Sequence, residues 1–251
     1  MGRLTDAVKH LLIINAILFF ATLLYSDEMY HWLSLWFPAN PNFKFWQVIS
    51  HMFMHGGYAH IGFNMFALWM FGTPVERVLG KNRFLFVYFS AGLGAVLFQL
   101  GYHYFTFLPA QEQLFGLGFT QENILQVISA NRVPSGLQES QIATVRLAFQ
   151  NFSEAYFSRM VGASGCIMGV LAAFGMMNPE ARLMLIFLPI PIKAKYFIPG
   201  IILLDLVSAI TGQSFFSPSN TAFMAHVGGA IIGFLIMWYW KKNQFNQNRW
   251  D

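Results

Sequence analysis

The chain has 251 residues, of which 56% are hydrophobic and 10% charged, and its formal net charge is +4. A typical globular domain carries about 25% charged residues, so this chain has too little polar surface for an ordinary soluble domain. Its positive charge is too diluted to indicate a nucleic-acid-binding protein. The single cysteine, Cys166, excludes an intramolecular disulfide. The composition therefore favours a polytopic membrane protein.

Six apolar segments are candidate membrane spans, at about 10–25, 57–71, 84–108, 162–177, 197–213 and 222–240. The first has no small-x-small cleavage site after it, so we expect a retained helix rather than a signal peptide. The second, fourth and fifth are short for a span of roughly 17–25 residues and are rich in Gly and polar side chains. We expect these three inside a bundle rather than against lipid. The prediction is an all-α fold, with residues 1–251 forming a single membrane domain.

The lysines and arginines predict the orientation of these spans. With the N-terminus inside, eleven of them fall in inside segments and four in outside segments. Positive residues accumulate on the cytoplasmic side, so we expect both termini in the cytoplasm. The expected location is the inner membrane of a bacterium, with several passes.

Two outside segments have distinct compositions. Residues 26–56 are rich in aromatic side chains, which prefer the headgroup region, and we expect this first loop to lie in the membrane interface. Residues 109–160 are more polar, and 121–130 and 138–158 have helix-like apolar spacing. We predict a small extramembrane helical insertion at 109–160.

A short motif, Gly162-Ala163-Ser164-Gly165, opens the fourth span. Small residues are common at helix contacts, so the motif by itself favours a packing surface. A serine at a helix start also lies beside unpaired backbone N–H groups, which can hold the oxyanion formed when its Oγ attacks a carbonyl. Both interpretations stay open on this motif alone.

The last span begins with Ala225-His226-Val227-Gly228-Gly229. An ionisable side chain inside a membrane helix is costly and indicates a functional site. Gly229 gives this helix a face that another helix can approach closely, and the glycines near Ser164 offer a similar face. We expect His226 to come within reach of Ser164 as a general base. The alternative is a buried histidine bonded to a backbone carbonyl.

Three histidines and an asparagine precede or enter the second span: His51, His55, His60 and Asn64. His60 and Asn64 are four residues apart, on one helical face, and both can donate hydrogen bonds to an oxyanion. Clustered histidines also raise a metal site, but no His-Glu-x-x-His motif and no nearby acid or Cys supports one.

The fifth span holds one acid, Asp205, whereas an aspartyl intramembrane protease needs two such aspartates. We expect Asp205 to be neutral or hydrogen-bonded to a neighbour, with a structural role.

Together, the run from His51 to Asn64, Gly162-Ala163-Ser164-Gly165 and Ala225–Gly229 resemble the motifs of the rhomboid family of intramembrane serine proteases. The order, separation and span assignment of the three motifs agree with that family. The resemblance implies a six-helix core around a water-accessible cavity and a Ser–His dyad that works without an acid. We expect no metal or cofactor.

By resemblance, Ser164 is the nucleophile and His226 the base and then the acid. The oxyanion hole is made by His60, Asn64 and the backbone N–H of Ser164. The remaining motif residues support the site structurally: His51, His55, Gly162, Gly165 and Gly229.

The sequence departs from the family pattern in three places. The first loop has Trp46-Gln47 instead of a Trp-Arg pair, Met168 stands where many relatives have an aromatic residue, and the insertion at 109–160 is long. A methionine can still pack on an imidazole, though less rigidly.

The function we predict is endopeptidase cleavage of peptide bonds in or near transmembrane segments of other membrane proteins. We expect substrates whose helix is weakened by Gly, Pro or polar residues, because a peptide bond must unwind before it can reach the site. The partners are thus membrane proteins and the lipid bilayer, with no nucleic acid. Two alternatives are a catalytically silent rhomboid-like protein that binds transmembrane segments, and a small transporter with His226 and Asp205 as proton relays.

Overall fold

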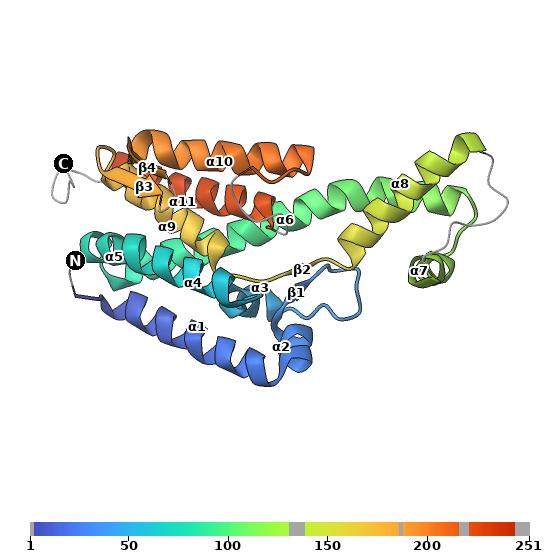
Figure 1. Cartoon of the computed structure of the whole chain (residues 1–251), viewed down its shortest axis with the longest axis horizontal. Coiled ribbons are helices and arrows are strands. Elements are labelled where there is room, and N and C mark those ends of the chain that lie inside the picture. The colour runs from blue at the N-terminus through green and yellow to red at the C-terminus, as the bar shows by residue number, and fades with distance from the viewer. Residues whose placement is uncertain (1–2, 131–138, 186–187, 216–220, 244–251) are drawn as a thin grey trace.

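The computed structural model describes residues 3–130, 139–185, 188–215 and 221–243. Helical segments occupy all six positions predicted for membrane spans and form a bundle (Figure 1). The helices of this bundle are α1 (Asp6–Leu24), α4 (Tyr58–Ala67), α5 (Thr73–Leu79), α6 (Lys81–Gly116), α9 (Ser164–Met177), α10 (Ala194–Thr211) and α11 (Phe223–Asn243).

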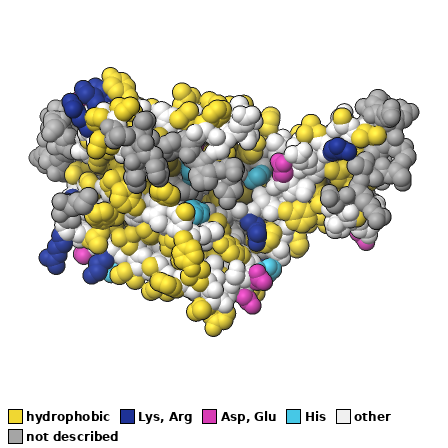
Figure 2. All heavy atoms as spheres, in the orientation of Figure 1, with side chains coloured by type: hydrophobic (Ala, Val, Ile, Leu, Met, Phe, Trp, Pro, Cys, Tyr) yellow, Lys and Arg dark blue, Asp and Glu magenta, His cyan; other side chains and the backbone are white. Residues whose placement is uncertain are grey.

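Four of these helices, α1, α6, α10 and α11, are long and apolar enough to cross a membrane. The second span is longer than expected, because a π-helical turn at Leu68–Gly72 joins α4 to α5 without a break. Large apolar side chains are exposed along the bundle, such as Phe20 and Ile210, and Figure 2 shows apolar side chains over much of its visible surface. The bundle is therefore that of a polytopic helical membrane protein.

Helix α9 lies at the centre of the bundle, against α6 and α11. Residues 165–174 are all buried, which confirms that the short fourth span is an interior helix. The same expectation is wrong for the fifth span. Helix α10 lies at the edge of the bundle (Figure 1), with Leu203 and Ile210 exposed and Asp205 and Ser208 turned inward.

Helix α6 has 36 residues and runs well past the end predicted at 108, continuing through Pro109. At 1.5 Å per residue it is about 54 Å long, whereas a bilayer core is about 30 Å thick. Its far part packs against α8 (Glu139–Tyr156), which also contacts α7 (Gln121–Ala130); these are the two helices predicted in the insertion (Figure 1). We call the described residues of 100–156 the lobe.

The lobe has a core of its own, separate from that of the bundle. Its buried members are apolar and largely aromatic: Phe37, Phe107, Ala110, Leu114, Ile124, Val145, Ala148, Phe149, Phe152, Ala155 and Tyr156. One of them, Phe37, comes from the first loop, and the side-chain amide of Asn40 donates to the Tyr156 carbonyl at 2.9 Å. The first loop is therefore fastened to the lobe.

The first loop contains α2 (Ser26–Leu33), β1 (Leu35–Trp36), α3 (Gln47–Ser50) and a 3₁₀ turn (His51–Phe53). Strand β1 pairs antiparallel with β2 (Arg159–Met160), which leads into α9. Three aromatic side chains of the loop are exposed: Trp32, Phe45 and Trp46. The rings of Trp32 and Trp46 stack with centroids 6.0 Å apart.

At the other end of the bundle, β3 (Arg182–Leu185) and β4 (Leu188–Lys193) form an antiparallel hairpin. Glu180 forms ion pairs with Lys193 and Lys195, at 2.6 and 2.5 Å. The start of α1 and the end of α11 lie at this same end (Figure 1), as an even number of spans requires.

Candidate functional site

Ser164 is the first residue of α9 and is half-buried. The chain reaches it from β2 through Gly162, whose φ of 124° is in the region that favours glycine. The backbone N–H of Gly162 donates to the His51 carbonyl at 2.9 Å, which ties the turn to the first loop. The hydroxyl is thus held at a helix start, where the first backbone N–H groups have no partner within the helix.

His226 lies in the first turn of α11, and glycines bring this helix against α9. A Cβ added at Gly229 would collide with the Gly165 carbonyl oxygen, and one at Gly233 with that of Gly169. Both pairs advance in the same direction, so the two helices run parallel and their starts are adjacent. The structure therefore brings together the backbone segments that carry Ser164 and His226.

Asp205 of α10 faces the same histidine. Its Oδ2 accepts a hydrogen bond from Nδ1 of His226 at 2.7 Å, and its side chain is 1% exposed. Asp205 was expected to be neutral or bonded to a neighbour, in a structural role, and the structure identifies the neighbour as His226. Sequence reasoning paired the two residues only in the transporter alternative, although the only acid in one span and the only histidine in the next were a usable signal.

His60 lies beside the turn that leads to Ser164. A Cβ built on Gly162 would be 2.8 Å from His60 Nε2 and 3.6 Å from Ser164 Oγ. His60 Nδ1 accepts the backbone N–H of Gly56 at 3.2 Å. In a neutral ring the proton is therefore on Nε2, the nitrogen that faces the turn. His60 is also close enough to His226 for their charges to interact.

Asn64 follows one turn later in α4 and is buried, with 6% exposure. Its side-chain nitrogen, Nδ2, has no hydrogen-bond partner in the part of the chain that the structure describes. A buried donor without a partner is costly, and such groups are frequent at functional sites. Asn64 thus has a donor free for a ligand.

His51 and His55 lie in the first loop. Nδ1 of His51 donates to the Gln47 carbonyl at 2.8 Å, and burial lowers the pKa of His51 to about 4. Burial, and then the neighbouring His60, lower the pKa of His55 to about 3. The rings of His55 and His60 are 5.1 Å apart. Among the described residues, no group of three or more His, Cys, Asp and Glu is placed to hold a metal ion.

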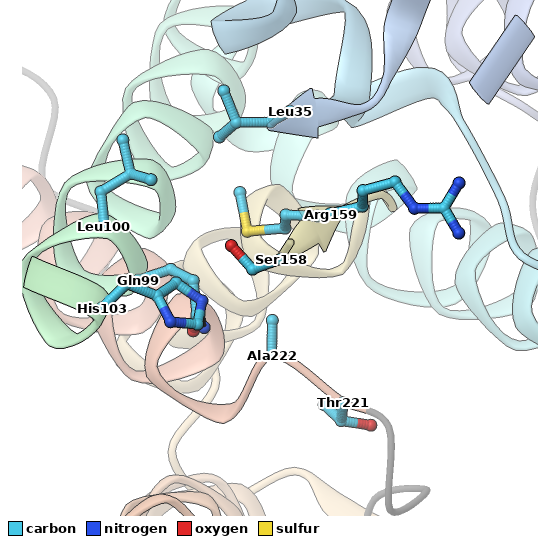
Figure 3. A pocket seen from close by; sticks show the side chains of 9 residues that line it. Leu35, Gln99, Leu100, His103, Ser158, Arg159, Thr221 and Ala222 are labelled. Atoms are coloured by element: carbon cyan, nitrogen blue, oxygen red, sulfur yellow. Dashed lines mark hydrogen bonds between the residues drawn. The ribbon is translucent and has the colours of Figure 1, made fainter. Parts of the chain in front are cut away.

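A cavity of about 220 Å³ lies between β2 and the segment that enters α11 (Figure 3), and Ser164, His226, His60 and Asn64 are not among the residues that line it. Its lining includes Ser158 and Met160 from the β2 side, Thr221 and Ala222 just before α11, and His103 from α6. Figure 3 shows the guanidinium of Arg159 directed away from His103 and Ala222, and that group lies over the Trp36 ring at 5.3 Å. Arg159 also lines the cavity, so the lining combines apolar and polar side chains with a basic one.

Comparison with known proteins identifies the family. The profile of the rhomboid domain matches residues 42–120 and 140–243, which is most of the chain. The chain belongs to the rhomboid family. The two matched parts leave out 121–139, so the gap covers α7, while β2, α9, α10 and α11 fall within the second part.

Curated relatives agree with this rhomboid assignment. The chain is 28% identical over 207 residues to the presenilin-associated rhomboid-like protein, mitochondrial, of Rattus norvegicus, covering 81% of this chain and 40% of that protein. It is 27% identical to rhomboid protein 1, mitochondrial, of Saccharomyces cerevisiae, covering 78% and 42%. Rhomboid protease GluP of Bacillus subtilis is 30% identical, covering 55% and 27%. The chain spans about two fifths of the length of the first two relatives.

One departure from the rhomboid pattern, Gln47, has a clear structural role. The residue is buried, and its Oε1 accepts the backbone N–H of Lys44 at 3.0 Å. Its Nε2 donates to the carbonyls of Asn42 and His31 at 3.0 and 3.2 Å. Gln47 therefore holds together backbone segments on both sides of the loop, a neutral role for which no arginine is needed.

A second departure from the rhomboid pattern, Met168, is buried in the core of the bundle, one turn after Ser164. Its side chain is 7% exposed. The position is thus filled by an apolar group that packs within the helix bundle.

Proposed function

We propose that this rhomboid chain is an intramembrane serine endopeptidase that cleaves peptide bonds in or near transmembrane segments of other membrane proteins. The observation that carries the proposal is the glycine-mediated contact of α9 with α11. It sets the helix start of Ser164 beside that of His226, with Nε2 of His60 over the same turn. The name of the B. subtilis relative, rhomboid protease GluP, supports the same activity.

In the proposed mechanism, His226 takes the proton of Ser164 as Oγ attacks the scissile carbonyl carbon. The tetrahedral intermediate carries its negative charge on the former carbonyl oxygen. His60 Nε2–H, Asn64 Nδ2–H and the backbone N–H of Ser164 donate to that oxygen. His226 then gives its proton to the leaving amine, and water cleaves the acyl-enzyme by the same steps. Gly162, Gly165 and Gly229 permit the close approach, while His51 and His55 support the turn.

The substrate enters as an extended segment in this proposal. Strand β2 borders this cavity. Among the described residues β2 pairs only with β1, so its other edge has no strand beside it. An extended peptide can add to such an edge. A helix must unwind to present such a segment, so we propose single-span substrates weakened by Gly, Pro or polar residues. The lipid bilayer is the other partner.

We further propose a multi-pass location in a bacterial inner membrane, with both termini cytoplasmic and the lobe outside. The basic residues near the termini and near the β3–β4 hairpin support this orientation, and the length of α6 supports a lobe that extends beyond the bilayer core. A protease added to intact cells should then cut within the lobe and spare 178–195, and the reverse pattern would contradict the orientation.

The experiment that tests the activity is covalent labelling by a fluorophosphonate, with cleavage of a single-span substrate measured in parallel. Ser164→Ala should abolish both, and His226→Ala should reduce both by orders of magnitude, since a hydroxyl without a base is a poor nucleophile. Asn64→Ala removes one of three donors, and we expect about a 10²–10³-fold loss of turnover with measurable labelling.

The outcomes separate the proposed protease from its alternatives. Cleavage by Ser164→Ala at the wild-type rate would overturn the assignment of the nucleophile. Absence of labelling in the folded wild-type protein would favour a silent binding protein or a transporter. Wild-type turnover in Asn64→Ala would remove only the oxyanion role of Asn64.

A further inference from the structure

His226 is held from α10 as well as by its own helix. The hydrogen bond from its Nδ1 to Asp205 Oδ2 is 2.7 Å long, and the two side chains are 12% and 1% exposed. We propose that Asp205 is a positioning residue for catalysis, so that the chain works with a Ser164–His226–Asp205 triad instead of a dyad. This inference rests on the proposed function.

The hydrogen bond to Asp205 sets the tautomer of His226. A carboxylate can only accept, so Nδ1 must carry the proton that it donates to Asp205. In a neutral ring the lone pair is then on Nε2, the only other ring nitrogen. A general base needs that lone pair to take the proton of Ser164. Asp205 therefore selects the tautomer in which His226 can act.

Asp205 also compensates the positive charge that forms on the His226 ring. When His226 takes the proton of Ser164, its ring becomes positive in a largely buried place, where an unpaired charge is costly. Asp205 supplies a negative partner already in position, so the charge that forms is compensated at short range. The same arrangement stabilises the imidazolium in Ser–His–Asp proteases of unrelated folds.

A general need of α10 for polar contacts with its neighbours does not explain the bond from His226 to Asp205. Ser208 lies almost one turn after Asp205 in α10 and is equally buried. Its hydroxyl donates to the Leu204 carbonyl of its own helix at 2.8 Å. Ser208 thus donates within α10 and accepts the backbone N–H of Phe215 just beyond it at 3.4 Å, whereas Asp205 reaches across to the histidine of the proposed site. Ser208 is for that reason a matched control.

The test compares Asp205→Asn with Ser208→Ala in the full-length protein. Asn has nearly the same shape as Asp, but its amide can donate to Nδ1 and favour the opposite tautomer. We expect Asp205→Asn to lower kcat by about 10²–10⁴-fold with KM within about threefold, and to slow fluorophosphonate labelling by a similar factor. Ser208→Ala should keep kcat and labelling within about threefold of the wild-type values, whatever its thermal midpoint. Asp205→Glu should recover part of the lost kcat, because it restores a carboxylate.

A purely structural Asp205 gives a different result. Folded Asp205→Asn with kcat within about threefold of wild type would overturn the inference while Ser164 is still labelled. If neither the wild type nor any variant is labelled, the proposed function and this inference fail together.

If Asp205→Asn does not fold, the tautomer of His226 is measured instead in the wild-type protein, from the ¹⁵N spectrum of the histidine rings. The His226 signals are assigned by their loss in His226→Ala. Protonated Nδ1 with unprotonated Nε2 supports the inference, and the opposite tautomer overturns it.

Discussion

The bundle and the lobe are packed by different means, and their glycines show the difference. In the bundle, Cβ atoms at Gly228, Gly229 and Gly233 would collide with backbone oxygen atoms of neighbouring helices, because backbones approach closely there. In the lobe, Cβ atoms at Gly101, Gly116 and Gly118 would meet nothing within 4 Å. The lobe is instead filled by Phe107, Phe149, Phe152 and their neighbours.

The contrast follows from the two surroundings. Between helices in lipid there is little hydrophobic driving force, so association depends on close van der Waals contact through small residues. In the orientation proposed above the lobe lies outside the membrane, where it gains stability by removing large apolar side chains from water. The site belongs to the first kind of packing, which explains why small residues flank Ser164 and His226.

The strongest way to break this comparison is a branched side chain at the α9–α11 contact. Gly229→Val places three carbon atoms where the Gly165 carbonyl lies, so we expect loss of the folded bundle and of Ser164 labelling. The matched control is Gly101→Val, which lies in open space on α6 and should leave the thermal midpoint and labelling nearly unchanged. Gly229→Val that labels at the wild-type rate would show that the two helices do not touch as described.

A second variant addresses the lobe alone. Phe152 is completely buried, and Phe152→Ala should cost about 3–5 kcal/mol of local stability, because it leaves a cavity. Amide hydrogen exchange in α7 and α8 should accelerate, while Ser164 labelling stays within about twofold. Leu147→Ala, at a 54% exposed position of the same helix, is the control and should change neither. Equal destabilisation of the bundle would mean that the two cores form one cooperative unit.

The smallest expected effect concerns the first loop, which joins the two regions. The pKa values of His51 and His55 are about 4 and 3, whereas an unfolded histidine titrates near 6.5. As pH falls below 6.5 the unfolded state takes up protons that the folded state excludes, so stability is lost. Between pH 6.5 and 5.5 the loss is about 1 kcal/mol for each histidine.

Thermal midpoints in detergent at several pH values check this prediction. The variant His51→Gln, which keeps a donor for the Gln47 carbonyl, should reduce the loss of stability between pH 6.5 and 5.5 by about 1 kcal/mol. An unchanged slope in His51→Gln would show that this histidine takes up protons in the folded state.

The positions of the six helices could be predicted from the sequence, because hydropathy reports directly on burial in lipid. The helix starts at Ser164 and near His226 could also be predicted, because in each place small residues surround one polar residue at the beginning of an apolar segment. The length of α6 did not follow, since Pro109 reads as a helix end, yet the helix continues through it to pack in the lobe.

Two further features depend on contacts that local patterns do not contain. The bond between Asp205 and His226 joins two helices whose relative rotation is set by tertiary packing. Likewise, Gln47 differs from the family pattern at one position, and only the folded loop shows the five backbone groups within its reach. Neither bond could be read from the sequence, because each depends on how separate segments pack.

The parallel contact between α9 and α11 has a consequence for biosynthesis. The ribosome makes Ser164 before α10 and α11, so a growing chain holds the serine long before Asp205 and His226 exist. The serine meets its histidine only after the last helix has been inserted and has packed against Gly165 and Gly169. In the proposed protease, a half-made chain therefore lacks its general base, and the site is complete only once the last helix has packed.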